Sequence, residues 1–168
     1  MTDLHPTIHA HHDALTDFLD AARSVEPTKW DSPPAPGEWS PGQVVEHAAL
    51  SYKVNLGVLH GRAQGAAAPR FLRPIFRVFL LNPVLRNGTY PLLTKSPPVL
   101  QPSETPTSPA VLIERLQAAA MTFERDAATI SADTIDHPFF SRLCLVEFVR
   151  FQEIHTRHHC QQLAHGAV

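Results

Sequence analysis

The sequence has little cysteine, little net charge and no long apolar run. Its two cysteines, Cys144 and Cys160, lie in one predicted helix about four and a half turns apart, too far to form a disulfide within a straight helix. We therefore expect free thiols in a reducing compartment. The 14 Lys and Arg against 16 Asp and Glu give a formal charge of -2, so the whole-protein charge attracts neither nucleic acid nor an anionic membrane.

No segment approaches the roughly 20 uninterrupted apolar residues of a membrane-spanning helix. The most apolar stretch, residues 71–85, is interrupted by two arginines and two prolines. The first 19 residues lack the apolar core flanked by Lys or Arg that marks a secretory signal. We expect a cytoplasmic protein with neither a nucleic-acid nor a membrane partner.

Histidine and proline, in contrast, are abundant, with 11 and 16 residues in a chain of 168. This length fits a single domain, residues 1–168, that buries about two-thirds of its surface without a disulfide. Histidine changes its charge near neutral pH and is the commonest metal ligand, so the chemistry is sought among the histidines.

Apolar residues spaced three and four apart predict four long helices, over about residues 6–25, 41–59, 109–130 and 143–164. The second helix has a clear start, with Ser40 as N-cap, Pro41 in the first turn and Gln43 completing a capping box. Ser108 and Pro109 repeat the cap-then-proline signal. No period of two suggests strands, and residues 136–141 are expected to form a turn. The prediction is an all-α fold, a four-helix bundle with one long crossing connection.

That connection, Gly61 to Pro106, is rich in proline and is expected to hold one or two short helices. Ordering so long a segment is costly, so we expect its apolar side chains to be buried, over the metal end of the bundle described below, at its far end or in a dimer contact. Those side chains are Phe71, Leu72, Ile75, Phe76, Phe79 and Leu80.

Arg70, Arg73 and Arg77 share one face of a helix within this connection. Such a face suits an anionic substrate or a lipid surface, but a solvated side of a covering helix is the more ordinary interpretation. If the connection reaches the metal end, Arg73 or Arg77 would contact an anion there.

Three histidines are predicted to face the interior. His155 and His159 are four residues apart on the last helix, on the apolar face that carries Phe148 and Phe151. His47 lies on the inward stripe of the second helix. Converging buried imidazoles need partners for their acceptor nitrogens, which a metal ion supplies, although a single inward histidine is more often a hydrogen-bonded core residue.

Two motifs from opposite ends of the chain resemble those of the DinB superfamily. The first, Pro36-Gly-Glu-Trp-Ser-Pro-Gly-Gln-Val-Val-Glu-His47, is similar to the start of that family's second helix. The second comprises His137-Pro-Phe-Phe-Ser-Arg-Leu143 and Phe151-Gln-Glu-Ile-His-Thr-Arg-His-His-Cys-Gln-Gln162, which resembles the closing His-x-x-x-His-x-x-Gln motif.

The resemblance implies an up-up-down-down four-helix bundle, often a homodimer, whose histidine triad binds zinc, nickel or a similar divalent ion. Residue by residue, the implied ligands are His47, His155 and His159, whereas His158 matches no ligand position. Gln162 lies on the same face as His155 and His159, so we expect it to orient a ligand imidazole. The long Pro-rich connection departs from the family pattern, so the family gives no guide to the substrate.

The residues leave the function open between classes. Part of the superfamily consists of S-transferases that use low-molecular-weight thiols, and on this resemblance we place thiol transfer ahead of metal-dependent hydrolysis. A metal-binding or stress protein without turnover is the third alternative. Glu46 and Glu153 flank the histidines, but no carboxylate is predicted to converge with them as a general base, and no catalytic residue is assigned.

A second histidine group, His5, His9 and His12, shares a face of the first helix. A terminal run rich in His and Asp is usually solvated, so we expect at most adventitious metal binding there. The paired Glu-x-x-His motifs of di-iron bundles and the His-Glu-x-x-His motif of zinc proteases are absent from the sequence.

Overall fold

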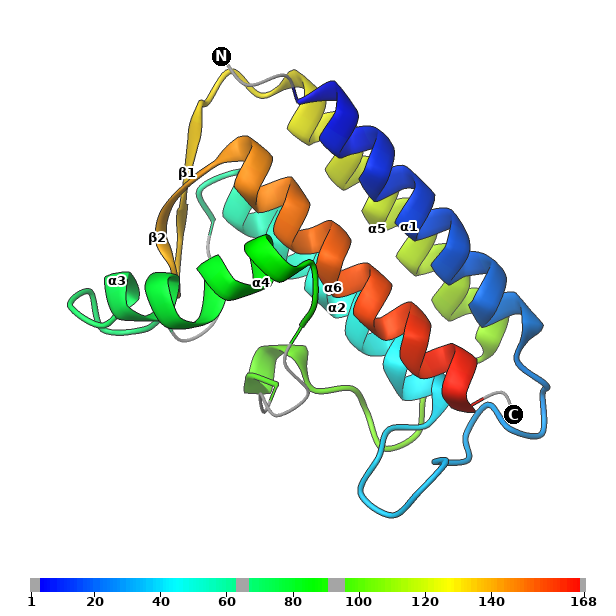
Figure 1. Cartoon of the computed structure of the whole chain (residues 1–168). Helices are drawn as coiled ribbons and strands as arrows, with labels where there is room; N and C mark the ends of the chain where they lie inside the picture. The colour runs from blue at the N-terminus through cyan, green and yellow to red at the C-terminus, as the bar shows by residue number, and fades with distance from the viewer. Residues whose placement is uncertain (1–3, 63–66, 91–95, 167–168) are drawn as a thin grey trace.

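Four long helices dominate the structure, a computed structural model that describes residues 4–62, 67–90 and 96–166 (Figure 1). They are α1 (His5–Ser24), α2 (Pro41–Leu59), α5 (Pro109–Thr129) and α6 (Leu145–Gly166). Helix α1 packs against α6 and α5, and α2 packs against α5 and α6. The predicted helices are all present, and both halves of the capping box at Ser40 and Gln43 form. No described helix has the length and apolar character to cross a membrane.

The directions of these helices differ from the predicted up-up-down-down order. The contacts that fix them are His11–Glu124 and Arg23–Gln117 between α1 and α5, Tyr52–Phe123 and His60–Asp126 between α2 and α5, and His47–His155 and Asn55–Gln152 between α2 and α6. Helix α2 is therefore parallel to α5, and both are antiparallel to α1 and α6, as the colour gradient in Figure 1 also shows.

The order is thus up-down-down-up. The up-up-down-down order was implied by the family resemblance alone. Hydrophobic periodicity shows which face of a helix is buried but carries no information on its direction, so the pattern of residues could not correct it.

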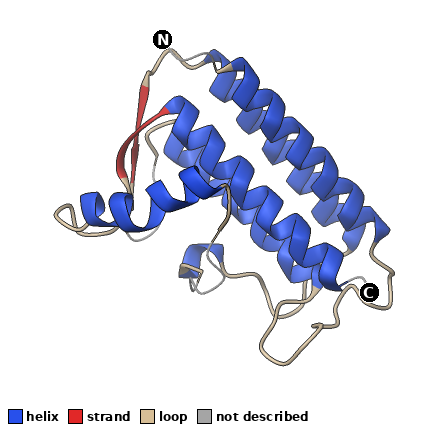
Figure 2. Cartoon of the chain, in the orientation of Figure 1, coloured by secondary structure: helices blue, strands red, loops and turns tan. Residues whose placement is uncertain are grey.

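A two-stranded hairpin that the sequence did not predict joins α5 to α6 (Figure 2). Strand β1 (Thr134–His137) pairs antiparallel with β2 (Ser141–Cys144), and Ser141 has a positive φ of 64° at the turn. Four residues are too few for a period-two pattern to stand out. Cys144 therefore lies exposed on β2, and α6 begins two residues later than expected.

The long connection is needed because α2 and α5 are parallel, so the chain must return along the helices before α5 begins. It carries a continuous helical run comprising α3 (Arg73–Phe76), η1 (Arg77–Leu81) and α4 (Asn82–Asn87), and later a short helix, η2 (Pro98–Leu100). Segment η1 is π-helical: the Asn82 N–H donates to the Arg77 carbonyl. Pro83 has no N–H to donate and its ring crowds the preceding turn, which accounts for the widened helix.

Half of the apolar side chains of residues 71–85 are exposed, among them four of the six expected to be buried. Leu81 and Val84 are buried against the core, and Phe76 is partly buried. The exposed ones are Phe71, Ile75, Val78, Phe79 and Leu80. The run is apolar on nearly every side, so packing one face against the core leaves the opposite face in solvent.

The core also contains a histidine that the sequence pattern misplaced. The spacing of the apolar residues Ile8 and Leu15 predicts that His12 lies with them on the inward face of the first helix. In α1, however, His11 is fully buried and His12 is exposed. His11 hydrogen-bonds to the Glu124 carboxylate through Nδ1 at 2.8 Å and to the Tyr52 hydroxyl through Nε2 at 2.9 Å. These bonds satisfy an imidazole that is costly to bury alone.

Candidate metal centre

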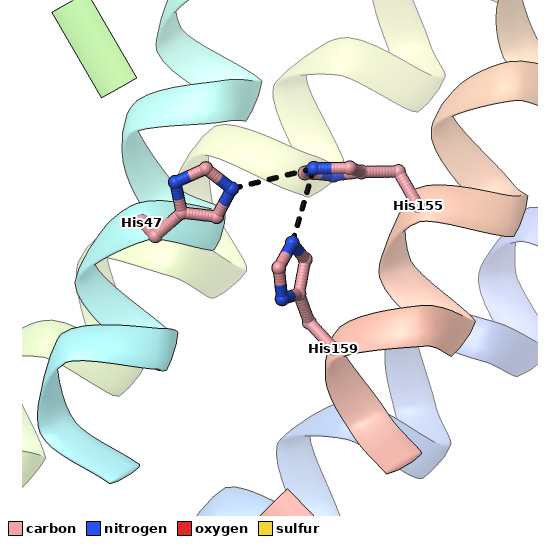
Figure 3. A group of neighbouring side chains, drawn as sticks. All are labelled: His47, His155 and His159. Atoms are coloured by element: carbon pink, nitrogen blue, oxygen red, sulfur yellow. Dashed lines mark hydrogen bonds between the residues drawn. The ribbon is translucent and has the colours of Figure 1, made fainter. Parts of the chain in front are cut away.

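Three histidines from two antiparallel helices meet in the interior (Figure 3). His47 lies about two turns into α2, and His155 and His159 lie one turn apart on α6. All three side chains are buried. Because α2 and α6 run in opposite directions, the early part of α2 faces the later part of α6. The structure therefore brings the three predicted ligands together.

The Nε2 atoms of the three imidazoles point toward one another. His155 Nε2 lies 3.3 Å from His47 Nε2 and 3.1 Å from His159 Nε2. Two nitrogens bound to one tetrahedral zinc ion at about 2.0–2.1 Å would be roughly 3.4 Å apart. Within the described part of the chain, this is the one cluster of three or more His, Cys, Asp or Glu whose ligand atoms lie within 4.8 Å of one another.

The outer nitrogens of two imidazoles are held by acceptors. His47 Nδ1 donates to the Leu100 carbonyl oxygen at 2.7 Å, and His159 Nδ1 donates to Gln162 Oε1 at 2.7 Å. The Gln162 contact is the one predicted from the helix spacing. The Leu100 contact could not be read from the sequence, because it is made by a main-chain atom about 50 residues away.

The third imidazole faces a small polar network. His155 Nδ1 lies 3.5 Å from Ser51 Oγ. Ser51 donates its own hydrogen to Gln152 Oε1, which also accepts from Asn55 Nδ2, so a lone pair of the Ser51 hydroxyl is left for His155. Sequence reasoning missed this network, although Ser51 lies one turn after His47 on the same stripe.

These contacts favour the tautomer of each histidine that is protonated on Nδ1. An imidazole that donates through Nδ1 and is neutral has a lone pair on Nε2. Three such lone pairs would then face one another at close range inside the protein, an unfavourable arrangement that a cation relieves. The donor set, three neutral imidazoles, suits zinc, nickel and related ions.

Burial keeps these histidines neutral. Desolvation lowers the pKa of His47, and it lowers the pKa of His155 well below 6.5, with further lowering by the neighbouring histidines. Desolvation, followed by the charge of His47, brings the pKa of His159 to about 3. Neutral imidazole is the form that binds metal, so the site is available at neutral pH.

Comparison with known families gives the same assignment. The family model of the DinB superfamily matches residues 10–163. The chain belongs to the DinB superfamily. No curated protein and no solved structure matched the chain. In this superfamily member, the two motifs identified in the sequence are those that carry the histidine cluster.

Two aromatic rings flank the cluster. The Trp39 ring, just before α2, lies 4.7 Å from the His47 ring, and the Tyr90 ring, after α4, lies 5.3 Å from the His155 ring, centre to centre. Tyr90 also contacts His158, whose Nε2 is 3.4 Å from Gln162 Nε2 and is not part of the cluster. The long connection therefore reaches the histidines through Tyr90 and Leu100.

The flanking carboxylates are bound elsewhere. Glu46 accepts from the Ser103 amide and hydroxyl, and Glu153 forms ion pairs with Arg150 and Arg157. Neither glutamate has a hydrogen bond to the clustered histidines among the described contacts. The two arginines expected as anion contacts are also engaged: Arg73 with Asp136, and Arg77 with Glu147, at the hairpin end of the molecule. The prediction that they contact an anion near the metal is therefore not supported.

The other histidines singled out in the sequence do not join the cluster. His9 pairs with Asp13 and His12 with Glu124. His9, His12 and Glu124 line a surface depression with His5. His137, in the motif near the hairpin, is buried and stacks on Phe140, and burial brings its pKa to about 3.

The depressed pKa values predict that acid destabilises the metal-free protein. In the unfolded chain, His137 and His159 take up protons below about pH 6.5. In the folded state, the same two histidines stay neutral until about pH 3. Their contribution to the free energy of unfolding is therefore complete above about pH 6.5 and is lost as the pH falls toward about 3. At about pH 5 each should cost about 2 kcal/mol of unfolding free energy relative to about pH 7.5, measured by urea unfolding with chelator present.

The His137→Gln variant keeps a hydrogen-bond acceptor for the Phe139 amide but cannot take up a proton. Between the two pH values, its unfolding free energy should fall by about 2 kcal/mol less than that of the parent protein. An equal pH dependence in the variant and the parent protein would contradict the assignment for His137.

Proposed function

We propose that this DinB superfamily member binds one divalent metal ion, zinc or nickel, through Nε2 of His47, His155 and His159. The observation that carries the proposal is the convergence of three Nε2 atoms whose rings are oriented from behind by Leu100, Ser51 and Gln162. The contacts among α1, α2, α5 and α6 support a four-helix bundle, and the family match over residues 10–163 supports a single domain over residues 1–168.

A divalent ion held by three histidines has at least one open coordination position, where it acts as a Lewis acid toward a thiol or a water molecule. The protein's own contribution is orientation and exclusion of water. Trp39 and Tyr90 cover two of the imidazoles, and the Nδ1 bonds fix the rings. We infer that a small substrate binds beside these rings.

Thiol transfer fits the site better than hydrolysis. A hydrolase of this kind generally needs a general base beside the water molecule. Glu46 and Glu153 are the nearest carboxylates in sequence, and both are held by other partners. A low-molecular-weight thiol is acidic enough to ionise at a metal without such a base. We therefore propose a thiol-dependent S-transferase that works in the cytoplasm as a homodimer.

Each of His47→Ala, His155→Ala and His159→Ala should abolish stoichiometric metal binding, because two imidazoles cannot hold the ion as three do. The measurement is metal content by elemental analysis of protein purified without metal-affinity steps. His158→Ala and His5→Ala are the controls, and both should retain one metal per chain. An unchanged metal content in the His47 variant would show that the triad is not the site.

Gln162→Ala should weaken metal affinity by about ten- to a hundredfold, because it removes the acceptor that orients His159. Competition with a chromogenic chelator gives the affinity. Gln162→Glu retains an acceptor for Nδ1 and should bind metal at least as tightly as the parent protein. If the alanine variant binds as tightly as the parent, the Gln162 contact has no role in the site.

The choice between thiol transfer and the alternatives is tested with cobalt-substituted protein. Addition of a low-molecular-weight thiol such as cysteine should produce a sulfur-to-cobalt charge-transfer band in the near ultraviolet, absent in the His155→Ala variant. Saturation of the band, followed by thiol consumption with an electrophilic substrate, supports the transferase. Ester hydrolysis without a thiol band would favour the hydrolase. If neither the thiol band nor hydrolysis is observed, the result would favour a non-catalytic metal-binding protein.

A further inference from the structure

A face of the long connection exposes large apolar side chains. Of the seven large apolar residues that are exposed in the described part of the chain, five lie between residues 71 and 80. The rings of Phe71 and Phe79 are 76% and 73% exposed. We call this the α3–η1 face; it consists of Phe71, Ile75, Val78, Phe79 and Leu80.

The spacing places three of these residues on one side of the projection. Ile75 and Phe79 are four residues apart within the helical run, and Phe71 lies four residues earlier, in the turn just before it. Figure 1 shows α3 and the start of this run projecting away from the four long helices. A contiguous apolar face on a projection is typical of an interaction site, because exposing it to water is costly.

The segment of the chain that carries this face is basic. Residues 47–103 contain seven Lys or Arg and no Asp or Glu, whereas all 16 acidic residues lie in the rest of the chain. Arg73 and Arg77 are paired with acidic residues of the hairpin end. Arg62, Arg70 and Arg86 are exposed, and none of them has an ion pair within the described residues.

We propose that the α3–η1 face binds the surface of an anionic phospholipid membrane. Phenylalanine and aliphatic side chains beside exposed arginines are the composition of segments that lie at a membrane interface. The phenylalanine rings would enter the boundary between headgroups and acyl chains. Arg70, next to Phe71, would contact the lipid phosphates, and Arg62 and Arg86 add to the positive charge of the segment. The expectation of no membrane partner rested on the net charge of -2, which conceals this asymmetry.

The same charges argue against self-association through this face. A twofold dimer built on the α3–η1 face would place the arginines of one copy beside those of the other. Like charges brought together at an interface are destabilising. An anionic lipid surface satisfies the apolar and the basic groups at once.

The test is flotation of the full chain with lipid vesicles. The protein should float with vesicles of phosphatidylcholine and phosphatidylglycerol and not with phosphatidylcholine alone, and binding should weaken as salt is raised. The double variant Phe71→Ser/Phe79→Ser should lose at least about tenfold in affinity, because it removes the two most exposed rings. Arg70→Glu should weaken binding while leaving the apolar face intact.

Met121→Ser is the matched control, since Met121 is a 54% exposed apolar residue on α5. Unchanged circular dichroism and metal content in all variants show that they are folded. Absence of binding to anionic vesicles overturns the proposal, and so does equal binding by the double variant and the Met121 control. A dimer that dissociates only in the double variant, without vesicle binding, would assign the face to self-association.

Discussion

The structure around the histidine cluster depends on one constraint, that three buried imidazoles must present unprotonated nitrogens to the same point. Each ring meets it in a different way: His47 through a main-chain carbonyl, His159 through a side chain one turn away, and His155 through the Ser51 hydroxyl. Since burial also disfavours the charged form, orientation and protonation are set by the same packing. The antiparallel arrangement of α2 and α6 is what makes the convergence possible.

The parallel arrangement of α2 and α5 accounts for the other unusual feature, the long proline-rich connection. A chain that leaves the end of α2 must travel back along the helices before it can begin α5. On this path it passes the histidines, where Tyr90 and Leu100 contact them, and it also carries the exposed α3–η1 face. One connection therefore supports the histidine cluster at one point and exposes an apolar face to solvent at another.

Much of this could be predicted from the sequence, for physical reasons. The helices and the capping box follow from local periodicity and spacing, and so does the meeting of His159 with Gln162, which are three residues apart. Helix direction, the contact between Leu100 and His47, and the place of Ser51 depend on contacts distant in sequence, which periodicity does not encode. The burial of His11 in place of His12 shows that a one-residue error in helical phase exchanges a core side chain for a surface one. The hairpin was too short to recognise.

The acceptor for His47 is a main-chain oxygen, and this changes what evolution is able to alter. Any amino acid at position 100 supplies a carbonyl, so the side chain there is free to vary while the ligand keeps its orientation. What selection must preserve is the path of the backbone through η2 (Pro98–Leu100), which Pro98 and the preceding Pro97 help to fix. Among relatives, the support of this ligand would therefore be inherited as loop length and proline placement, and it would leave no trace as a conserved side chain.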